Sequence, residues 1–127
     1  MATTKHTVLL IDDDESIRKV LRLRLERAGY RVLIAQQGEE GLALATTERP
    51  ALILLDLQMP RMDGREVLRR LKANPDTKPI PVILLTGDKS EHLRSEGIAA
   101  GANAFVQKPV SGARLSEVVD TLLPAKK

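Results

Sequence analysis

The sequence has no cysteine and no tryptophan, and only one phenylalanine and one tyrosine. The lack of cysteine excludes disulfides and thiolate metal sites. Because aromatic rings are so few, the core must be built from Leu, Ile, Val and Ala. The same shortage leaves almost nothing on which nucleic-acid bases could stack.

Long apolar runs and blocks of one charge are also absent. No apolar run approaches the roughly 20 residues that a membrane-spanning helix needs, and the short polar start does not resemble a signal peptide. The net charge is +3, but the basic residues are dispersed among acidic ones. The length of 127 residues fits one domain, residues 1–127. We therefore expect a cytoplasmic protein without direct nucleic-acid or membrane contacts.

Five short apolar runs alternate with segments of helical spacing. The runs cover residues 7–11, 31–35, 51–55, 80–85 and 104–106. Three of them are almost continuously apolar, which is typical of strands buried on both faces of a parallel sheet. Apolar residues with helical spacing follow in segments 17–25, 39–46, 67–71, 93–100 and 115–123. This alternation predicts an α/β fold, a (βα)5 doubly wound parallel sheet.

Three residues are expected to shape the ends of helices. Gly29 follows the first helical segment, where a left-handed cap is common. Ser111 is a candidate N-cap for the last helix. Gly64 is expected to adopt a positive φ in the turn before the third helix.

Polar residues follow four of the five predicted strands at their carboxyl ends. They are Asp12, Asp13 and Asp14 after the first strand, Asp56 after the third, Thr86 after the fourth and Lys108 after the fifth. In a doubly wound sheet these ends share one edge, where sites form. We therefore expect these side chains to converge.

The chemistry of this group favours phosphoryl transfer. Clustered carboxylates repel one another, and hard oxygen ligands of this kind suit Mg²⁺. Beside the metal, Asp56 can stay ionised and attack phosphorus as a nucleophile. Lys108 adds positive charge and Thr86 a hydroxyl donor, in a reaction that depends mostly on positioning and electrostatics.

Each residue alone has a simpler interpretation. Asp12, Asp13 and Asp14 could cap the first helix, where the helix dipole favours acidic groups. Asp56 could be a loop residue, Thr86 could bond its own backbone, and Lys108 could be solvated. Their common position at strand ends is what favours a shared site.

At this point the sequence resembles the receiver domains of response regulators in two-component signalling. The segments that carry the resemblance are VLLIDDDESIR, LILLDLQMPRMDG, VILLTG and GANAFVQKP. The middle one is the most specific, and the likeness covers essentially the whole chain. It implies a flavodoxin-like fold with strand order 2-1-3-4-5 and a phosphoacceptor switch rather than an enzyme with an external substrate.

The resemblance also implies roles for single residues. Asp56 would accept the phosphoryl group, Asp13 would bind Mg²⁺ directly, and Asp12 would hold it through water. The remaining site residues of the family pattern are Gln58, a metal ligand through its carbonyl, Thr86 and Lys108, which would contact the phosphoryl group, and Pro109, expected to follow a cis peptide bond.

Two further surfaces follow from the resemblance. Phe105 stands at the family's switch position, where an aromatic ring turns inward when Thr86 moves toward the phosphate. Ile17 and Leu23, on the first helix, would dock a sensor histidine kinase or a histidine phosphotransfer protein. A downstream effector protein would bind the face made by the fourth helix, the fifth strand and the fifth helix.

Several alternatives are weaker. A dehalogenase-type phosphatase needs a second aspartate where Gln58 stands, and a flavodoxin-like cofactor binder needs a phosphate loop rather than the acidic run after the first strand. A degenerate receiver would lack one of the site residues. The chain itself is either a stand-alone regulator or a receiver cut from a longer protein.

Overall fold

The computed structural model describes residues 6–57, 59, 63–87, 91–108 and 112–123 of the chain. The strands in this part are β1 (Thr7–Ile11), β2 (Arg31–Ala35), β3 (Leu52–Asp56), β4 (Val82–Thr86) and β5 (Ala104–Gln107). The helices are α1 (Glu15–Arg27), α2 (Gly38–Glu48), α3 (Gly64–Ala73), α4 (Glu91–Ala99) and α5 (Gly112–Leu122). Strands and helices alternate throughout, as predicted. No helix among the described residues combines the length and apolarity needed to cross a bilayer.

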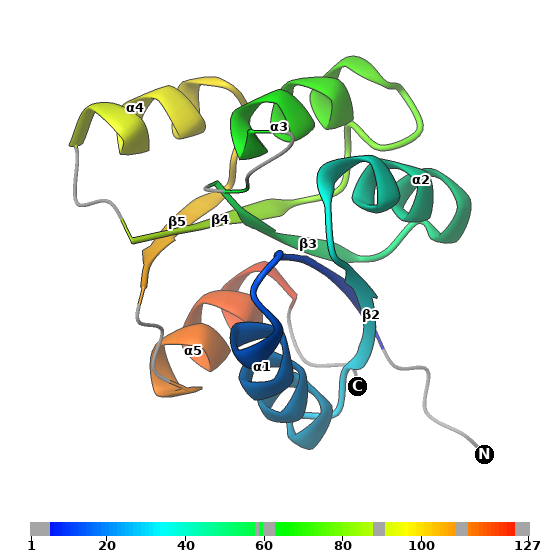
Figure 1. Ribbon diagram of the computed structural model, residues 1–127, viewed down its shortest axis with the longest axis vertical. Helices are drawn as coiled ribbons and strands as arrows, with labels where there is room; N and C mark the ends of the chain where they lie inside the picture. The colour runs from blue at the N-terminus through cyan, green and yellow to red at the C-terminus, as the bar shows by residue number, and fades with distance from the viewer. Residues whose placement is uncertain (1–5, 58, 60–62, 88–90, 109–111, 124–127) are drawn as a thin grey trace.

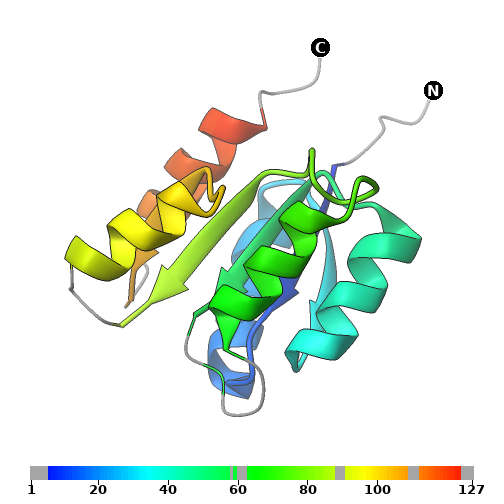
Figure 2. The ribbon, with the colours of Figure 1, turned by 90° about the horizontal axis from the view of Figure 1, so that it is seen from above.

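The five strands form one parallel sheet in the order β2-β1-β3-β4-β5. Helices α1 and α5 cover one face, and α2, α3 and α4 cover the other (Figures 1 and 2). This confirms the doubly wound fold and places β2 at an edge. The carboxyl ends of β1, β3, β4 and β5 therefore lie along one edge of the sheet.

The central strands are apolar at nearly every position because both of their faces are covered. In β3, Ile53 and Leu55 belong to the core cluster that includes residues of α3, whereas Leu52 and Leu54 belong to the cluster that includes residues of α1 and α5. All four side chains are fully buried. Burial of each contributes roughly 1.5–3 kcal/mol, so the strand that carries Asp56 is held firmly in place.

Helix α1 begins and ends with specific caps. The Asp14 carboxylate accepts hydrogen bonds from the backbone N–H groups of Ser16 at 2.9 Å and Ile17 at 3.2 Å. Bonds from the Ser16 hydroxyl and these N–H groups lower the pKa of Asp14. At the other end Gly29 has a φ of +97°, as predicted for a left-handed cap. The capping interpretation thus holds for Asp14. Ser111 lies outside the described residues.

The prediction that Gly64 has a positive φ is wrong. Gly64 is the first residue of α3, and positive φ values among the described residues occur at Gly29, Arg49 and Gly101. A Cβ at Gly64 would instead collide with the Asp56 carbonyl oxygen and lie 2.6 Å from the Leu57 Cα. Glycine is required because the start of α3 approaches the end of β3 so closely.

Candidate functional site

Asp12 and Asp13 follow β1 directly, but they differ in exposure. The Asp12 side chain is fully buried and Asp13 is exposed. The Asp12 Oδ1 atom accepts a hydrogen bond of 2.9 Å from the Asp14 N–H, and the Asp12 N–H donates to the Ala35 carbonyl at 3.1 Å. The main chain of Asp12 is therefore bonded to β2, and its carboxylate is bonded to the main chain of Asp14.

Asp56 and Thr86 are the last residues of their strands rather than the first residues after them. The ladder continues past the apolar runs, because the Leu57 N–H donates to the Leu85 carbonyl at 2.9 Å and the Lys108 N–H donates to the Thr86 carbonyl at 2.6 Å. Both side chains are buried, Asp56 at 2% and Thr86 at 0% exposure. The hydrogen-bonded strands therefore fix the main-chain positions of Asp56 and Thr86.

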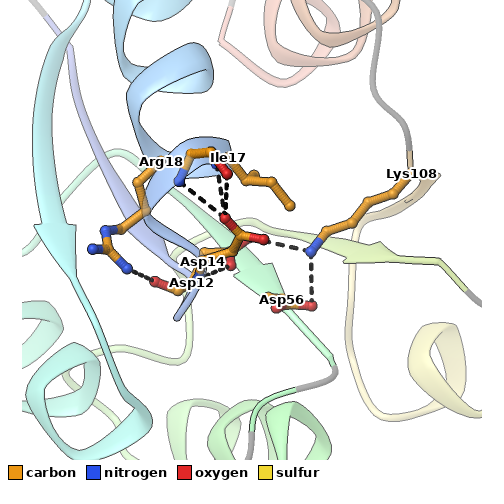
Figure 3. Close-up of polar contacts among 7 residues, drawn as sticks. Asp12, Asp14, Ile17, Arg18, Asp56 and Lys108 are labelled. Carbon is orange, nitrogen blue, oxygen red and sulfur yellow. Dashed lines mark hydrogen bonds and ion pairs between the residues drawn. The ribbon is translucent and has the colours of Figure 1, made fainter.

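Lys108 forms ion pairs with two aspartates, one that follows β1 and one that ends β3. Its Nζ lies 3.2 Å from the Asp56 Oδ1 and 3.3 Å from the Asp12 Oδ2 (Figure 3). A buried carboxylate without a cation beside it is costly, and removal of one partner from a buried ion pair typically destabilises a protein by about 3–5 kcal/mol. Lys108 therefore offsets much of the cost of burying Asp12 and Asp56 side by side.

The same carboxylates fit a divalent cation. Oxygen atoms of Asp12, Asp13 and Asp56 all lie within 4.8 Å of one another. Three ionised carboxylates and the Lys108 ammonium leave two negative charges, which one divalent cation would neutralise. Oxygen ligands are what Mg²⁺ prefers, with one or two protein carboxylates and several waters. The residues present therefore fit Mg²⁺, with Asp13 exposed toward solvent, from which the ion would enter.

The remaining predicted site residues are distributed around this cluster. Phe105, on β5 opposite Leu84, is half-buried and packs against the core cluster on the α2, α3 and α4 side of the sheet. On α1, Ile17 is half-buried and Leu23 is 49% exposed. The predictions for Gln58 and Pro109 concern residues outside those that the structure describes.

Arg18 also contributes to this site, although it was not predicted to do so. Its Nη1 atom donates a hydrogen bond of 2.9 Å to the Asp12 backbone carbonyl (Figure 3). Only the helical spacing gave a signal, because residue 18 lies one turn beyond Asp14 and thus on the same side of α1.

Comparison with known proteins gives consistent matches over most of the chain. The family model of the response regulator receiver domain matches residues 8–120. The transcriptional regulatory protein AfsQ1 of Streptomyces coelicolor is 42% identical over 117 residues, which are 92% of this chain and 51% of that protein. The alkaline phosphatase synthesis regulator PhoP of Bacillus subtilis is 38% identical, with 91% of this chain and 48% of that protein covered.

Solved structures agree with the fold and include a metal-bound example. Chemotaxis protein CheY4 of Vibrio cholerae has a TM-score of 0.90 at 33% identity, covering 94% of this chain and 100% of that one. The receiver domain of sensor histidine kinase PA1611 of Pseudomonas aeruginosa, described with a magnesium ion in its active-site cleft, has a TM-score of 0.87 at 26% identity, covering 96% and 100%.

The chain spans about half the length of the curated relatives it matches. Several of these relatives are named as transcriptional regulators. These names do not support the expectation, drawn from the sequence, that this protein makes no direct contact with nucleic acid. That expectation rested on the dispersed charge and the few aromatic residues of this chain alone.

Proposed function

Because the chain belongs to the response regulator receiver domains of two-component systems, we propose that Asp56 is its phosphoacceptor. The phosphoryl group would come from a phosphohistidine of a sensor histidine kinase or of a histidine phosphotransfer protein, in a reaction that requires Mg²⁺. The observation that carries the proposal is the buried Asp56 carboxylate, 3.2 Å from the Lys108 Nζ and clustered with Asp12 and Asp13.

In the transfer step, an Asp56 carboxylate oxygen forms a bond to phosphorus while the bond from phosphorus to the imidazole nitrogen of the donor breaks. The leaving imidazole keeps the electron pair of that bond. Bound Mg²⁺ supplies positive charge to the phosphoryl oxygens. Lys108 remains beside the new phosphate, and the Thr86 hydroxyl donates a hydrogen bond to it.

The hydrogen bonds of Asp12 indicate which carboxylate would bind the metal directly and which would bind it through water. Both of its carboxylate oxygens already accept from groups of the chain, Oδ1 from the Asp14 N–H and Oδ2 from Lys108. Among the described residues, none donates a hydrogen bond to the Asp13 carboxylate. Asp13 is therefore proposed to bind the metal directly, Asp12 to hold it through water, and the Gln58 carbonyl to complete the set.

Incubation with acetyl phosphate and Mg²⁺ is expected to add one phosphoryl group to the wild-type protein. The acceptor carboxylate, the Lys108 ammonium and the metal ligands all come from this chain. A small phosphodonor should therefore suffice for phosphorylation without a kinase. Intact mass spectrometry measures the gain, and the same incubation after chelation of Mg²⁺ is the control. A folded protein that binds Mg²⁺ yet gains no phosphoryl group would contradict the proposal.

Phosphorylation is further proposed to change the face formed by α4, β5 and α5. Thr86 would move toward the phosphate, and the half-buried ring of Phe105 would turn inward into the space that becomes free. A downstream effector would recognise the altered face. Apart from accepting the phosphoryl group from its donor, the chain is proposed to catalyse only its self-phosphorylation and its autodephosphorylation. A location in the cytoplasm stays a prediction.

The donor is proposed to dock on α1 through Ile17 and Leu23. Leu23→Ala should lower the rate of phosphotransfer from the cognate kinase about tenfold, because an exposed apolar anchor of an interface is lost. Ile98→Ala is the matched control, since Ile98 is 46% exposed but lies on α4. Phosphorylation by acetyl phosphate should not change in either variant. Equal kinase rates for wild type and Leu23→Ala would contradict the docking proposal.

A further inference from the structure

Arg18 makes an unusual contact for a cation beside a cluster of carboxylates. Its guanidinium donates to the Asp12 backbone carbonyl at 2.9 Å, and no ion pair of Arg18 with a carboxylate is found among the described residues. The side chain is half-buried. The contact therefore acts on the main chain at the point where β1 ends and the metal ligands begin.

This contact closes a ring of hydrogen bonds around the loop at residues 12–14. The Asp14 N–H donates to the Asp12 Oδ1 at 2.9 Å, the Arg18 N–H donates to the Asp14 carbonyl at 3.0 Å, and the Arg18 guanidinium returns to the Asp12 carbonyl. Asp13 lies between two residues whose backbones are thus fixed. Its exposed carboxylate accepts no hydrogen bond from the described residues, so these bonds can order it only through the main chain of its neighbours.

Two effects of Arg18 on a bound cation oppose each other. Its positive charge repels the cation, and this effect alone would make a variant without the charge bind metal more tightly. Its hydrogen bond orders the loop, and loss of this order would weaken binding. Figure 3 shows Arg18 and Lys108 on opposite sides of Asp12, with Asp56 on the Lys108 side. The guanidinium thus lies on the side of Asp12 away from Asp56 and Lys108, and the ordering effect should dominate.

We propose that Arg18 is a positioning residue, whose bond to the Asp12 carbonyl holds the 12–14 loop so that Asp12 and Asp13 are placed for a divalent cation. The proposal rests on the Mg²⁺-dependent function proposed above. It assigns to α1 a second task besides docking, since the helix would also order the metal ligands that precede it.

The test is the Mg²⁺ dissociation constant, measured from the backbone amide shifts of the 12–14 loop and Leu57 at constant ionic strength. Arg18→Met should weaken binding about tenfold, the lower end of the range for groups that orient metal ligands. Arg22→Met is the matched control, because it removes the same charge one turn further along α1, where the ion pair that the described residues give Arg22 is with Glu26 at 3.2 Å. It should bind Mg²⁺ as the wild type does.

The melting temperatures of the variants, measured without metal, show whether a loss of Mg²⁺ binding comes from the positions of the ligands or from a less stable fold. If Arg18→Met melts well below the wild type, Arg18→Lys and Arg22→Lys are compared instead, since both keep the charge. Arg18→Lys should then weaken binding to an intermediate degree, because an ammonium lacks the planar fork of a guanidinium. Unchanged or tighter Mg²⁺ binding in the Arg18 variants would overturn the inference and leave the proposed function intact. A wild type that binds no Mg²⁺ would overturn both.

Discussion

Asp56→Asn is expected to abolish phosphoryl acceptance, measured as the mass gained by the intact protein in acetyl phosphate and Mg²⁺. An amide is not a nucleophile toward phosphorus, whereas asparagine keeps the size of the side chain. The fold should persist, because Asp56 ends a strand whose other four residues are buried and apolar. Lys108 would retain its ion pair with Asp12 at 3.3 Å. The loss should therefore be chemical rather than structural.

Asp63→Asn is the matched control for this experiment. Asp63 lies shortly after Asp56 and caps α3, where its carboxylate accepts from the Arg65 N–H at 2.8 Å. Asparagine caps helices as well as aspartate does, and the exposed ion pair with Arg65 contributes little. Asp63→Asn should thus gain one phosphoryl group like the wild type. Phosphorylation that persists in Asp56→Asn would mean that the acceptor is another residue.

Gly64→Ala is expected to destabilise the protein by about 2 kcal/mol, within the range for overpacking in a filled interior. The added Cβ would meet backbone atoms, the Asp56 carbonyl oxygen and the Leu57 Cα, neither of which can turn aside as a side chain can. Urea unfolding measures the change. Because the collision displaces the end of β3, the rate of Asp56 phosphorylation should also fall.

Gly41→Ala provides the comparison for Gly64→Ala. Gly41 is also buried in a helix, but the atoms that a Cβ would meet there belong to the Ile11 side chain, with Cδ1 at 2.5 Å and Cγ1 at 2.8 Å. That side chain can shift, and alanine gains about 0.5–1 kcal/mol over glycine within a helix. The loss of stability should be clearly smaller than for Gly64→Ala. Equal losses in the two variants would contradict the backbone collision.

The five strands could be predicted from their apolar residues, but several of their ends could not. The runs 7–11 and 31–35 match β1 and β2. The run 104–106 is one residue shorter than β5, and β3 and β4 begin later than the runs 51–55 and 80–85 but extend one residue further, to the polar residues Asp56 and Thr86. Apolarity reports burial by neighbouring side chains, but a strand continues as long as its backbone ladder does. The two polar residues are thus part of the sheet, which makes their positions more rigid than loop residues would be.

That Asp12, Asp56 and Lys108 come together was predictable because parallel strand ends share one edge, but their contacts were not. The sequence placed Lys108 near the aspartates, yet only the structure gives its ion pairs with both Asp12 and Asp56. The bond of Arg18 to a carbonyl and the close approach at Gly64 depend on backbone positions, which residue types do not reveal. The predictions for Gln58 and Pro109 remain untested, since both lie outside the described residues.

The most direct test of the central claim is to locate the phosphoryl group in the phosphorylated wild-type protein. Borohydride reduces an aspartyl phosphate to homoserine, and mass spectrometry of the digested protein then identifies the altered residue. We predict homoserine at position 56 and unaltered aspartate at positions 12, 13 and 63. Homoserine at any of those other positions, or phosphate on a residue that borohydride does not reduce, would contradict the assignment of Asp56 as the phosphoacceptor.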